Sequence, residues 1–130
     1  MKINHTDHIA INTLDIEKTL FFYCDILGLK QEKSVDMGDE TLVYVRVNET
    51  TCLELCDLRG KCTSKQGYIT DVGGLRHIAF DVDNLFEWEE YLTEKGVPFE
   101  LHMVEMPKLG KRAILVCDPD GTVVELCCDL

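Results

Sequence analysis

Hydrophobic and polar side chains alternate over residues 8–12, and this alternation predicts a β-strand. Ile9 and Ile11 fall on one face, where a helix can cover them. The opposite face carries His8, Ala10 and Asn12. An ionisable side chain, His8, is therefore expected to point away from the side of the strand that packs.

A helix is predicted directly after this strand. Asp15 can cap its first turn, and Gly28 stands where a C-terminal cap is needed. Apolar residues recur at helical spacing between these two positions: Ile16, Leu20, Tyr23 and Leu27. We expect this apolar stripe to pack on the strand.

Two more strands are predicted over residues 41–47 and 51–56, joined by a turn at residues 48–49. The loop before them holds Asp36, Gly38 and Asp39. One face of the second strand carries Cys52, Glu54 and Cys56. Glu54 thus repeats the pattern of His8, because it is an ionisable residue opposite aliphatic neighbours.

Residues 57–74 lack steady periodicity and are interpreted as a linker, with mobile residues expected around 60–67. The plan then repeats, starting with a strand over residues 77–82. Its apolar face carries Ile78, Phe80 and Val82, and its other face carries His77, Ala79 and Asp81. Three later strands are expected over residues 99–104, 111–117 and 122–127. The last two are separated by a strong turn signal, Asp118-Pro119-Asp120-Gly121.

The helix of the second half lies between the first and second of its strands. Asn84 is expected to cap it, and Glu87 completes a pair that resembles a capping box. The buried stripe is predicted to consist of Leu85, Trp88 and Leu92. Gly96 is expected to end this helix.

The two halves repeat each other in sequence as well as in pattern. His-Ile-Ala occurs at His8 and again at His77. Each half closes on a similar tetrapeptide, Leu53-Glu54-Leu55-Cys56 or Val124-Glu125-Leu126-Cys127. A duplicated unit of this length indicates two copies of one supersecondary module, since it is too long for a solenoid repeat.

The predicted fold class is α+β. Tandem βαβββ modules, about residues 1–58 and 73–130, are expected to form a curved, partly open eight-stranded sheet with helices on its outer face. A chain of 130 residues suits a single domain over residues 1–130.

Composition narrows the possible partners. The formal net charge of −11 repels phosphate backbones, which argues against nucleic acid and anionic membranes as partners.

Neither a membrane span nor a signal peptide is recognised, so a cytoplasmic location is expected. Seven cysteines include an adjacent pair, Cys127-Cys128, which favours reduced thiols over a disulfide framework.

Four ionisable residues, His8, Glu54, His77 and Glu125, occupy equivalent places on the face opposite the helices. Two imidazoles and two carboxylates suit Ni²⁺, Co²⁺, Fe²⁺, Mn²⁺ or Zn²⁺. An octahedral ion held by four protein ligands keeps two positions for water or substrate oxygens. Taken one at a time, each residue is better explained as a hydrogen-bonded histidine or a solvated glutamate of a sheet, and only the repeat favours a metal site.

The chain resembles the vicinal oxygen chelate superfamily, and within it the glyoxalase I (lactoylglutathione lyase) type, over essentially its whole length. The first half carries the matching words Asp7-His8-Ile9-Ala10-Ile11, Phe22-Tyr23, Leu27-Gly28-Leu29 and Leu53-Glu54-Leu55. The second half carries Gly74-Leu75-Arg76-His77-Ile78-Ala79-Phe80, Gly96-Val97, Asp118-Pro119-Asp120-Gly121 and Val124-Glu125-Leu126.

The resemblance implies that His8, Glu54, His77 and Glu125 are metal ligands, with nickel or cobalt favoured over zinc, and iron or manganese as further options. It implies isomerisation of the hemithioacetal of methylglyoxal with glutathione or another thiol, through an enediolate, to a lactoyl thioester. Glu125 is then the expected base and Glu54 the second candidate. A homodimer is also implied, because relatives of this length often complete each metal site with modules from two chains.

The thiol's carboxylate needs a cation, and Asn12 stands where the resemblance leads one to expect an arginine. The candidates for this role are Arg59, Lys111 and Arg112, with Lys61 and Lys108 as further cations in loops. All of these also fit solvated surface charges.

Other functions remain open. Gly110-Lys111-Arg112 resembles a word of methylmalonyl-CoA epimerases, which suggests a CoA-ester epimerase with the two glutamates as proton acceptor and donor. An extradiol dioxygenase needs only two histidines and one carboxylate on Fe²⁺. A resistance protein that binds a small molecule, or a zinc site built from Cys52, Cys56 and Cys127, completes the alternatives. His5 and His102 have no assigned partner and are expected at the surface.

Overall fold

The computed structural model describes residues 1–61 and 73–130. Its contacts divide the chain into two compact units, Met1–Ser64 and Lys65–Leu130. Each predicted module lies within one of them, and their union in a single domain stays a prediction. Residues 62–72, which include most of the segment for which mobility was expected, lie outside the described residues.

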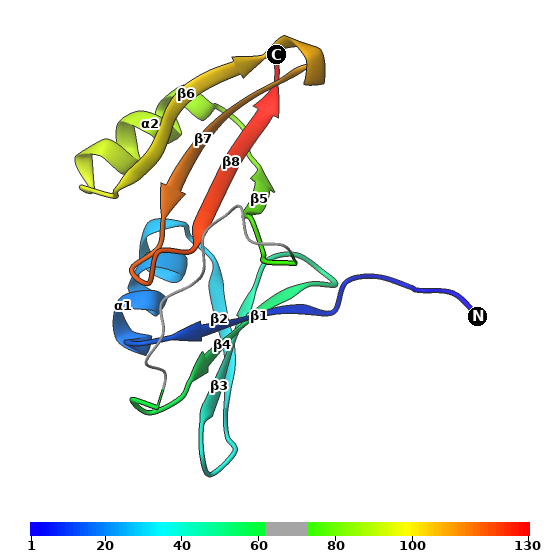
Figure 1. Ribbon diagram of the computed structural model, residues 1–130, viewed down its shortest axis with the longest axis vertical. Helices are drawn as coiled ribbons and strands as arrows, with labels where there is room; N and C mark the ends of the chain where they lie inside the picture. The colour runs from blue at the N-terminus through cyan, green and yellow to red at the C-terminus, as the bar shows by residue number, and fades with distance from the viewer. Residues whose placement is uncertain (62–72) are drawn as a thin grey trace. The chain divides into compact units, whose positions relative to one another are not determined.

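The described residues of unit 1 form one helical segment and four strands, labelled in Figure 1. In chain order they are β1 (His8–Thr13), α1 (Ile16–Leu20), η1 (Phe21–Ile26), β2 (Lys30–Asp36), β3 (Thr41–Arg46) and β4 (Cys52–Asp57). β1 pairs in parallel with β4, while β3 is antiparallel to both β4 and β2, which gives the strand order β1-β4-β3-β2.

Unit 2 repeats this plan. Its elements are β5 (Ile78–Asp81), α2 (Leu85–Glu94), β6 (Phe99–Met106), η2 (Pro107–Leu109), β7 (Lys111–Cys117) and β8 (Val123–Asp129). The strand order is β5-β8-β7-β6, again with a parallel first pair. The α+β class and the tandem βαβββ plan are therefore confirmed, and the expected eight strands pair as two sheets of four.

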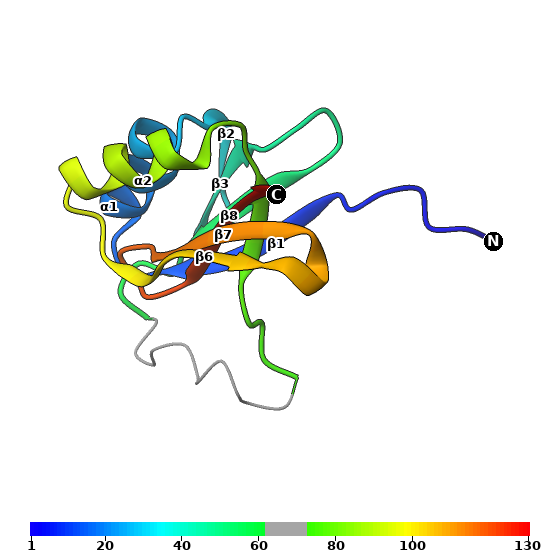
Figure 2. The same ribbon diagram turned by 90° about the horizontal axis from the view of Figure 1, so that it is seen from above.

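In each unit a helix packs on the central strands of its own sheet, α1 on β4 and α2 on β7 and β8 (Figure 2). The side chains of Ile11, Leu53 and Leu55 alternate with polar residues and are buried. Leu126 occupies the corresponding place in unit 2. This burial holds one face of β1, β4 and β8 against the core, and so fixes which residues appear on the other face.

The first helix differs from the regular α-helix that was expected. After α1 the chain widens into the π-helix η1, where the amide of Leu27 bonds to the carbonyl of Phe22 at 2.9 Å. Of the predicted stripe, Tyr23 and Leu27 are buried, whereas Ile16 and Leu20 are only partly covered. Within the wider turn Phe22 and Ile26 are buried as well. Both ends of the helix were also predicted correctly: the Asp15 carboxylate accepts from the Lys18 amide, and Gly28 has a positive φ of 76°.

The start of the second helix also differs from the prediction. The side chain of Asn84 makes no capping hydrogen bond, so the capping box with Glu87 does not form. Its backbone carbonyl instead accepts from the amides of Glu87 and Trp88 at 3.1 and 3.2 Å. Asn84 has φ −18° and ψ 77°, which is not the extended conformation that directs an N-cap side chain over the first turn. The stripe is otherwise as predicted: Leu85 and Leu92 are buried, and Trp88 is half-buried.

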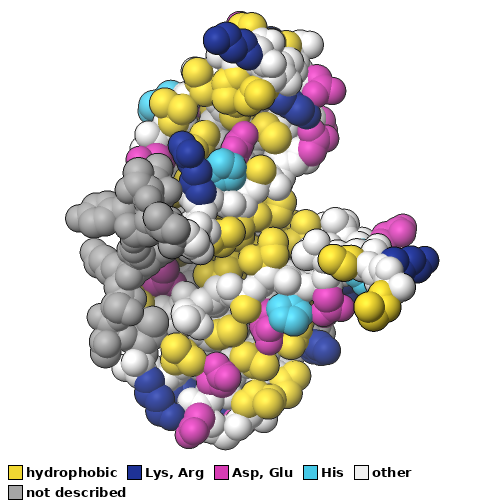
Figure 3. Space-filling view, turned by 45° about the vertical axis from the view of Figure 1, so that its right-hand side comes forward, with side chains coloured by type: hydrophobic (Ala, Val, Ile, Leu, Met, Phe, Trp, Pro, Cys, Tyr) yellow, Lys and Arg dark blue, Asp and Glu magenta, His cyan; other side chains and the backbone are white. Residues whose placement is uncertain are grey.

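Acidic and basic side chains are interspersed over the face shown in Figure 3. Among the described residues, none of the helices has the length and hydropathy of a membrane span.

Candidate functional site

The first predicted pair of metal ligands meets in unit 1. His8 begins β1, Glu54 lies in the middle of the adjacent parallel strand β4, and both face away from the buried leucines of β4. The His8 Nε2 and Glu54 Oε2 atoms are 3.1 Å apart. Glu54 is only 8% exposed, so its carboxylate has lost most of its hydrating water and depends on hydrogen-bond and ion-pair partners within the protein.

The second pair meets in the same way in unit 2. His77 directly precedes β5, and Glu125 lies on the adjacent parallel strand β8. The His77 Nε2 and Glu125 Oε2 atoms are 3.0 Å apart. Both side chains are partly exposed, so they remain accessible to solvent.

The two pairs arise from the same local geometry. Ala10 is the register partner of Glu54, and Ala79 is the register partner of Glu125. Each histidine stands two residues before its alanine, on the same face of the strand. The structure therefore brings together His8 with Glu54 and His77 with Glu125, each within one unit.

Unit 1 supports its pair with two further side chains. The His8 Nδ1 atom lies 2.8 Å from the Asp7 carboxylate, and this hydrogen bond raises the pKa of His8. The Tyr44 hydroxyl donates to Glu54 Oε1 at 2.9 Å, which raises the pKa of Tyr44 and keeps it a donor. The Lys33 Nζ atom lies 4.4 Å from the centre of the Tyr44 ring.

Sequence reasoning assigned no role to Tyr44, Lys33 or Asp7. Tyr44 is the register partner of Glu54 across the β3–β4 pair, and Lys33 is the partner of Tyr44 across β2–β3. The sequence carried no reliable signal for Tyr44, because counting outward from the predicted turn at residues 48–49 places residue 44 opposite residue 53, one position away from the observed partner Glu54.

The donor set fits a divalent metal. When the His8 ring is neutral, the bond to Asp7 assigns the ring proton to Nδ1, so the lone pair of Nε2 faces a Glu54 oxygen. Two acceptors 3.1 Å apart require a cation between or beside them, either a proton or a metal ion. Within the described part of either unit, no group of three or more His, Cys, Asp or Glu side chains is gathered for a metal ion. Each unit thus offers two ligands, and a four-ligand site stays a prediction.

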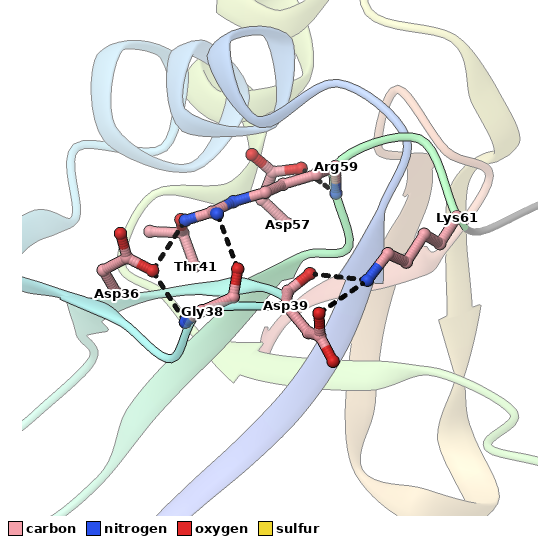
Figure 4. A network of polar contacts seen from close by, with 7 residues as sticks. All are labelled: Asp36, Gly38, Asp39, Thr41, Asp57, Arg59 and Lys61. Atoms are coloured by element: carbon pink, nitrogen blue, oxygen red, sulfur yellow. Dashed lines mark hydrogen bonds and ion pairs between the residues drawn. The ribbon is translucent and has the colours of Figure 1, made fainter.

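Arg59, predicted to bind a substrate carboxylate, lies in a network with the β2–β3 hairpin (Figure 4). Its guanidinium donates to Asp36 Oδ1 and to the Gly38 carbonyl, both at 2.7 Å, and to Thr41 Oγ1 at 3.0 Å. Lys61 pairs with Asp39 at 3.1 Å beside it. These bonds join the segment after β4 to the hairpin, and a role for Arg59 in binding a substrate stays a prediction.

The other two predicted cations are also engaged within unit 2. Lys111 Nζ lies 2.7 Å from Asp129 and 3.6 Å from Asp81. Arg112 pairs with Glu105 at 3.2 Å, and its guanidinium carbon lies 5.1 Å from the centre of the exposed Phe86 ring. Their role toward a co-substrate also stays a prediction.

The cysteines that share faces with the glutamates are small buried side chains. Cys52 and Cys56 are buried and Cys127 is half-buried, and each is a free thiol. Burial raises the pKa of both Cys56 and Cys127, which favours the neutral thiol over a metal-binding thiolate. The described residues therefore offer no support for a zinc site built from cysteines.

The two remaining histidines are both exposed. His102, to which no partner was assigned, lies 3.0 Å from Glu89 and stacks on Phe99 at 4.3 Å between ring centres. His102 is thus a surface residue, as predicted, and its contacts with Glu89 and Phe99 fill a place that the sequence left unassigned.

The family is shown by comparison with known proteins. A model described as "Glyoxalase/Bleomycin resistance protein/Dioxygenase superfamily" matches residues 5–126. A probable lactoylglutathione lyase of Synechocystis sp. is 34% identical over 126 residues, which cover 92% of this chain and 91% of that protein. The mitochondrial methylmalonyl-CoA epimerase of Homo sapiens is 30% identical over 129 residues, which cover 95% of this chain and 73% of that protein.

Among solved structures, a glyoxalase family protein from Enterococcus faecalis superimposes with a TM-score of 0.82 at 25% identity. The match covers 97% of this chain and 98% of that one. The sequence comparison and the structure comparison therefore agree on one family. The chain belongs to the glyoxalase/bleomycin resistance protein/dioxygenase superfamily.

Proposed function

We propose that this chain is a metal-dependent lyase of the glyoxalase I type. It would convert the hemithioacetal formed by methylglyoxal and a thiol, such as glutathione, into a lactoyl thioester. The observation that carries the proposal is the pair of equivalent half-sites, His8–Glu54 and His77–Glu125, each with its imidazole nitrogen about one hydrogen-bond length from a carboxylate oxygen.

The ligands proposed for one divalent metal ion are His8, Glu54, His77 and Glu125, with each module supplying half of them. Nickel or cobalt is favoured over zinc. The ion would act as a Lewis acid that polarises the substrate oxygens. Both histidines present Nε2 toward a carboxylate oxygen, and Asp7 orients one of the two rings.

The reaction moves one proton between adjacent carbons, and we propose Glu125 as its carrier. Its carboxylate would remove the proton from the carbon that bears sulfur, giving an enediolate, and would return it to the neighbouring carbon to complete the thioester. Glu125 is suited to this work because His77 is the one hydrogen-bonding or ion-pair partner of its carboxylate found among the described residues. It can therefore turn toward a substrate at the loss of a single contact.

A second candidate is epimerisation of a CoA ester, favoured by the 30% identity to the human methylmalonyl-CoA epimerase. That reaction also needs a carboxylate to remove a carbon-bound proton, and it returns a proton to the opposite face of the same carbon. The two candidates share a donor set and differ in substrate, so substrate assays separate them.

The test is purification without chelators, measurement of bound metal, and parallel assays of hemithioacetal isomerisation and CoA-ester epimerisation. Glu125→Gln keeps the size of the side chain but cannot accept a proton, and we expect a loss of turnover of about 10²–10⁴-fold. Glu54→Gln is the symmetric control, and all variants are compared at equal measured metal content. Near-parental turnover of the Glu125 variant beside an inactive Glu54 variant would move the base to unit 1. Full activity of both variants would refute the proton-shuttle mechanism.

A further inference from the structure

We propose that the two half-sites are unequal: Asp7 and Tyr44 are positioning residues that make His8–Glu54 the anchoring half of the metal site, and His77–Glu125 is the half that rearranges. The inference rests on the proposed metal site and concerns how the work is divided between its two repeats. It is carried by contacts that the two units do not share, although their ligand pairs have the same geometry.

The first difference lies next to each histidine. Asp7 precedes His8, and its carboxylate holds the ring at 2.8 Å through Nδ1. Arg76 precedes His77, and the His77 Nδ1 atom is buried without a hydrogen-bond partner among the described residues. A carboxylate that accepts from the far nitrogen fixes both the tautomer and the orientation of a ligand imidazole. The described contacts supply this support in unit 1 only.

The second difference lies opposite each glutamate. Tyr44 faces Glu54 across β3–β4, and Leu115 faces Glu125 at the equivalent place across β7–β8. The Tyr44 hydroxyl donates to Glu54 Oε1 while Oε2 lies toward His8, so both carboxylate oxygens are engaged. Leu115 has no polar group to offer Glu125.

Packing strengthens this asymmetry. Glu54 is buried, and the His8 and Tyr44 rings meet edge to face at 6.3 Å between their centres. Turning Glu54 away from His8 would break its hydrogen bond with the Tyr44 hydroxyl and would leave a buried carboxylate with too few hydrogen-bond partners. Glu125 is half-buried and would lose only its contact with His77. Unit 1 thus resists rearrangement more strongly than unit 2.

The test titrates Ni²⁺ into the metal-free full chain and follows binding by calorimetry. Tyr44→Phe and Asp7→Asn each remove one supporting contact and keep both ligands, so the dissociation constant should rise about 10–100-fold. Tyr91→Phe, which removes a phenol from helix α2, is the matched control and should change it less than twofold. Chemical unfolding of each metal-free variant shows whether the fold itself is affected.

The mirror variant uses the repeat. Leu115→Tyr places a phenol opposite Glu125, as Tyr44 stands opposite Glu54, and should tighten Ni²⁺ binding while lowering turnover at saturating substrate. A purely structural role of Tyr44 would produce no such opposite movement of affinity and turnover. Unchanged Ni²⁺ affinity in Tyr44→Phe and Asp7→Asn, in a parent that binds Ni²⁺, would overturn the inference.

The affinity measurement also separates this inference from the proposed function. Weaker Ni²⁺ binding by the unit 1 variants, together with a parent inactive toward both substrates, would leave the anchoring role standing and refute the proposed reaction. An active parent whose Ni²⁺ affinity is unchanged by the Tyr44 and Asp7 substitutions would support the proposed reaction and refute the anchoring role. A parent that binds no Ni²⁺, Co²⁺ or Zn²⁺ would overturn both.

Discussion

Replacing Asp118 tests how firmly the turn between β7 and β8 holds the strand that carries Glu125. Asp118 is 4% exposed, and its Oδ1 atom accepts from the amides of Asp120 at 2.9 Å and Thr122 at 2.8 Å. The Thr122 bond is buried, while the Asp120 amide is partly exposed. Removal of the carboxylate therefore leaves the Thr122 amide buried without a hydrogen-bond partner, whereas water can reach the Asp120 amide.

The structure gives an expected size for Asp118→Ala. A hydrogen bond to a charged group contributes about 1.5–3 kcal/mol, and a buried amide left unsatisfied costs about 1–3 kcal/mol. Because water can replace the bond to Asp120, we expect a total loss of about 2–4 kcal/mol in the free energy of unfolding. That is a large part of the 5–15 kcal/mol typical of a small domain.

The assay is equilibrium unfolding in urea with the metal-free protein, and the matched variant is Asp118→Asn. Asparagine keeps an acceptor oxygen at the same place, so its loss should be clearly smaller than that of alanine. A cost below about 1 kcal/mol for alanine would refute the calculation, since it would mean that the buried amide finds another partner. Equal costs for both variants would show that charge, and not the acceptor geometry, holds the turn.

Further predictions concern metal, assembly and thiol chemistry. Bound metal stabilises only the folded state, so adding Ni²⁺ or Co²⁺ at about 100 times its dissociation constant should raise the free energy of unfolding by about 2.7 kcal/mol, whereas an unchanged melting curve would favour a metal-free binding protein. Sedimentation should show a homodimer, and a monomer with full metal content and activity would remove the need for a partner. Burial raises the pKa of Cys117 above its ordinary 9.0, so the unfolded state loses this proton first and stability should fall as pH rises through about 9. Replacement by alanine should flatten that part of the stability curve.

Much of the fold could be predicted because one face of most strands is buried. Alternation located β1, β3, β4 and β8 to within one or two residues, and the repeat added confidence to the weaker signals of unit 2. β2 was assigned to no strand, because all its residues are exposed and its composition is polar. A strand at the edge of a sheet with no buried face carries no alternation to detect.

The helices show a second limit. The spacing of apolar residues between Asp15 and Gly28 predicts a regular helix, and nothing in that spacing distinguishes an α-helix from one that widens into a π-helix at Phe21. The predicted side-chain cap at Asn84 does not form for a similar reason, since the residue type is suitable but the backbone of Asn84 is not in the extended conformation that a capping side chain needs. Residue type predicts where a helix starts better than it predicts which atoms satisfy its first amides.

The two His–Glu pairs were predictable because they need little: a histidine at the start of one strand, and a glutamate in the middle of its parallel neighbour. Duplication preserved both requirements, so the repeated words His-Ile-Ala and Glu-Leu-Cys identify them. The supporting contacts come from positions that the repeat did not preserve. Unit 1 has Asp7 where unit 2 has Arg76, and Tyr44 where unit 2 has Leu115. The importance of these residues depends on the pairing register of the strands, which only the folded sheet shows.

This divergence has a functional logic under the proposed mechanism. A site whose four ligands were all held equally firmly would bind a metal ion well, but it would lack a carboxylate that can leave the ion to carry a proton. A site whose ligands were all loosely held would lose the ion when the base moved. A duplicated fold resolves the conflict by supporting one copy of the His–Glu pair through Asp7 and Tyr44 and leaving the other pair with fewer contacts in the described chain. In such a protein, the residues that break the internal symmetry next to the ligands are the ones from which the roles of the two halves can be argued.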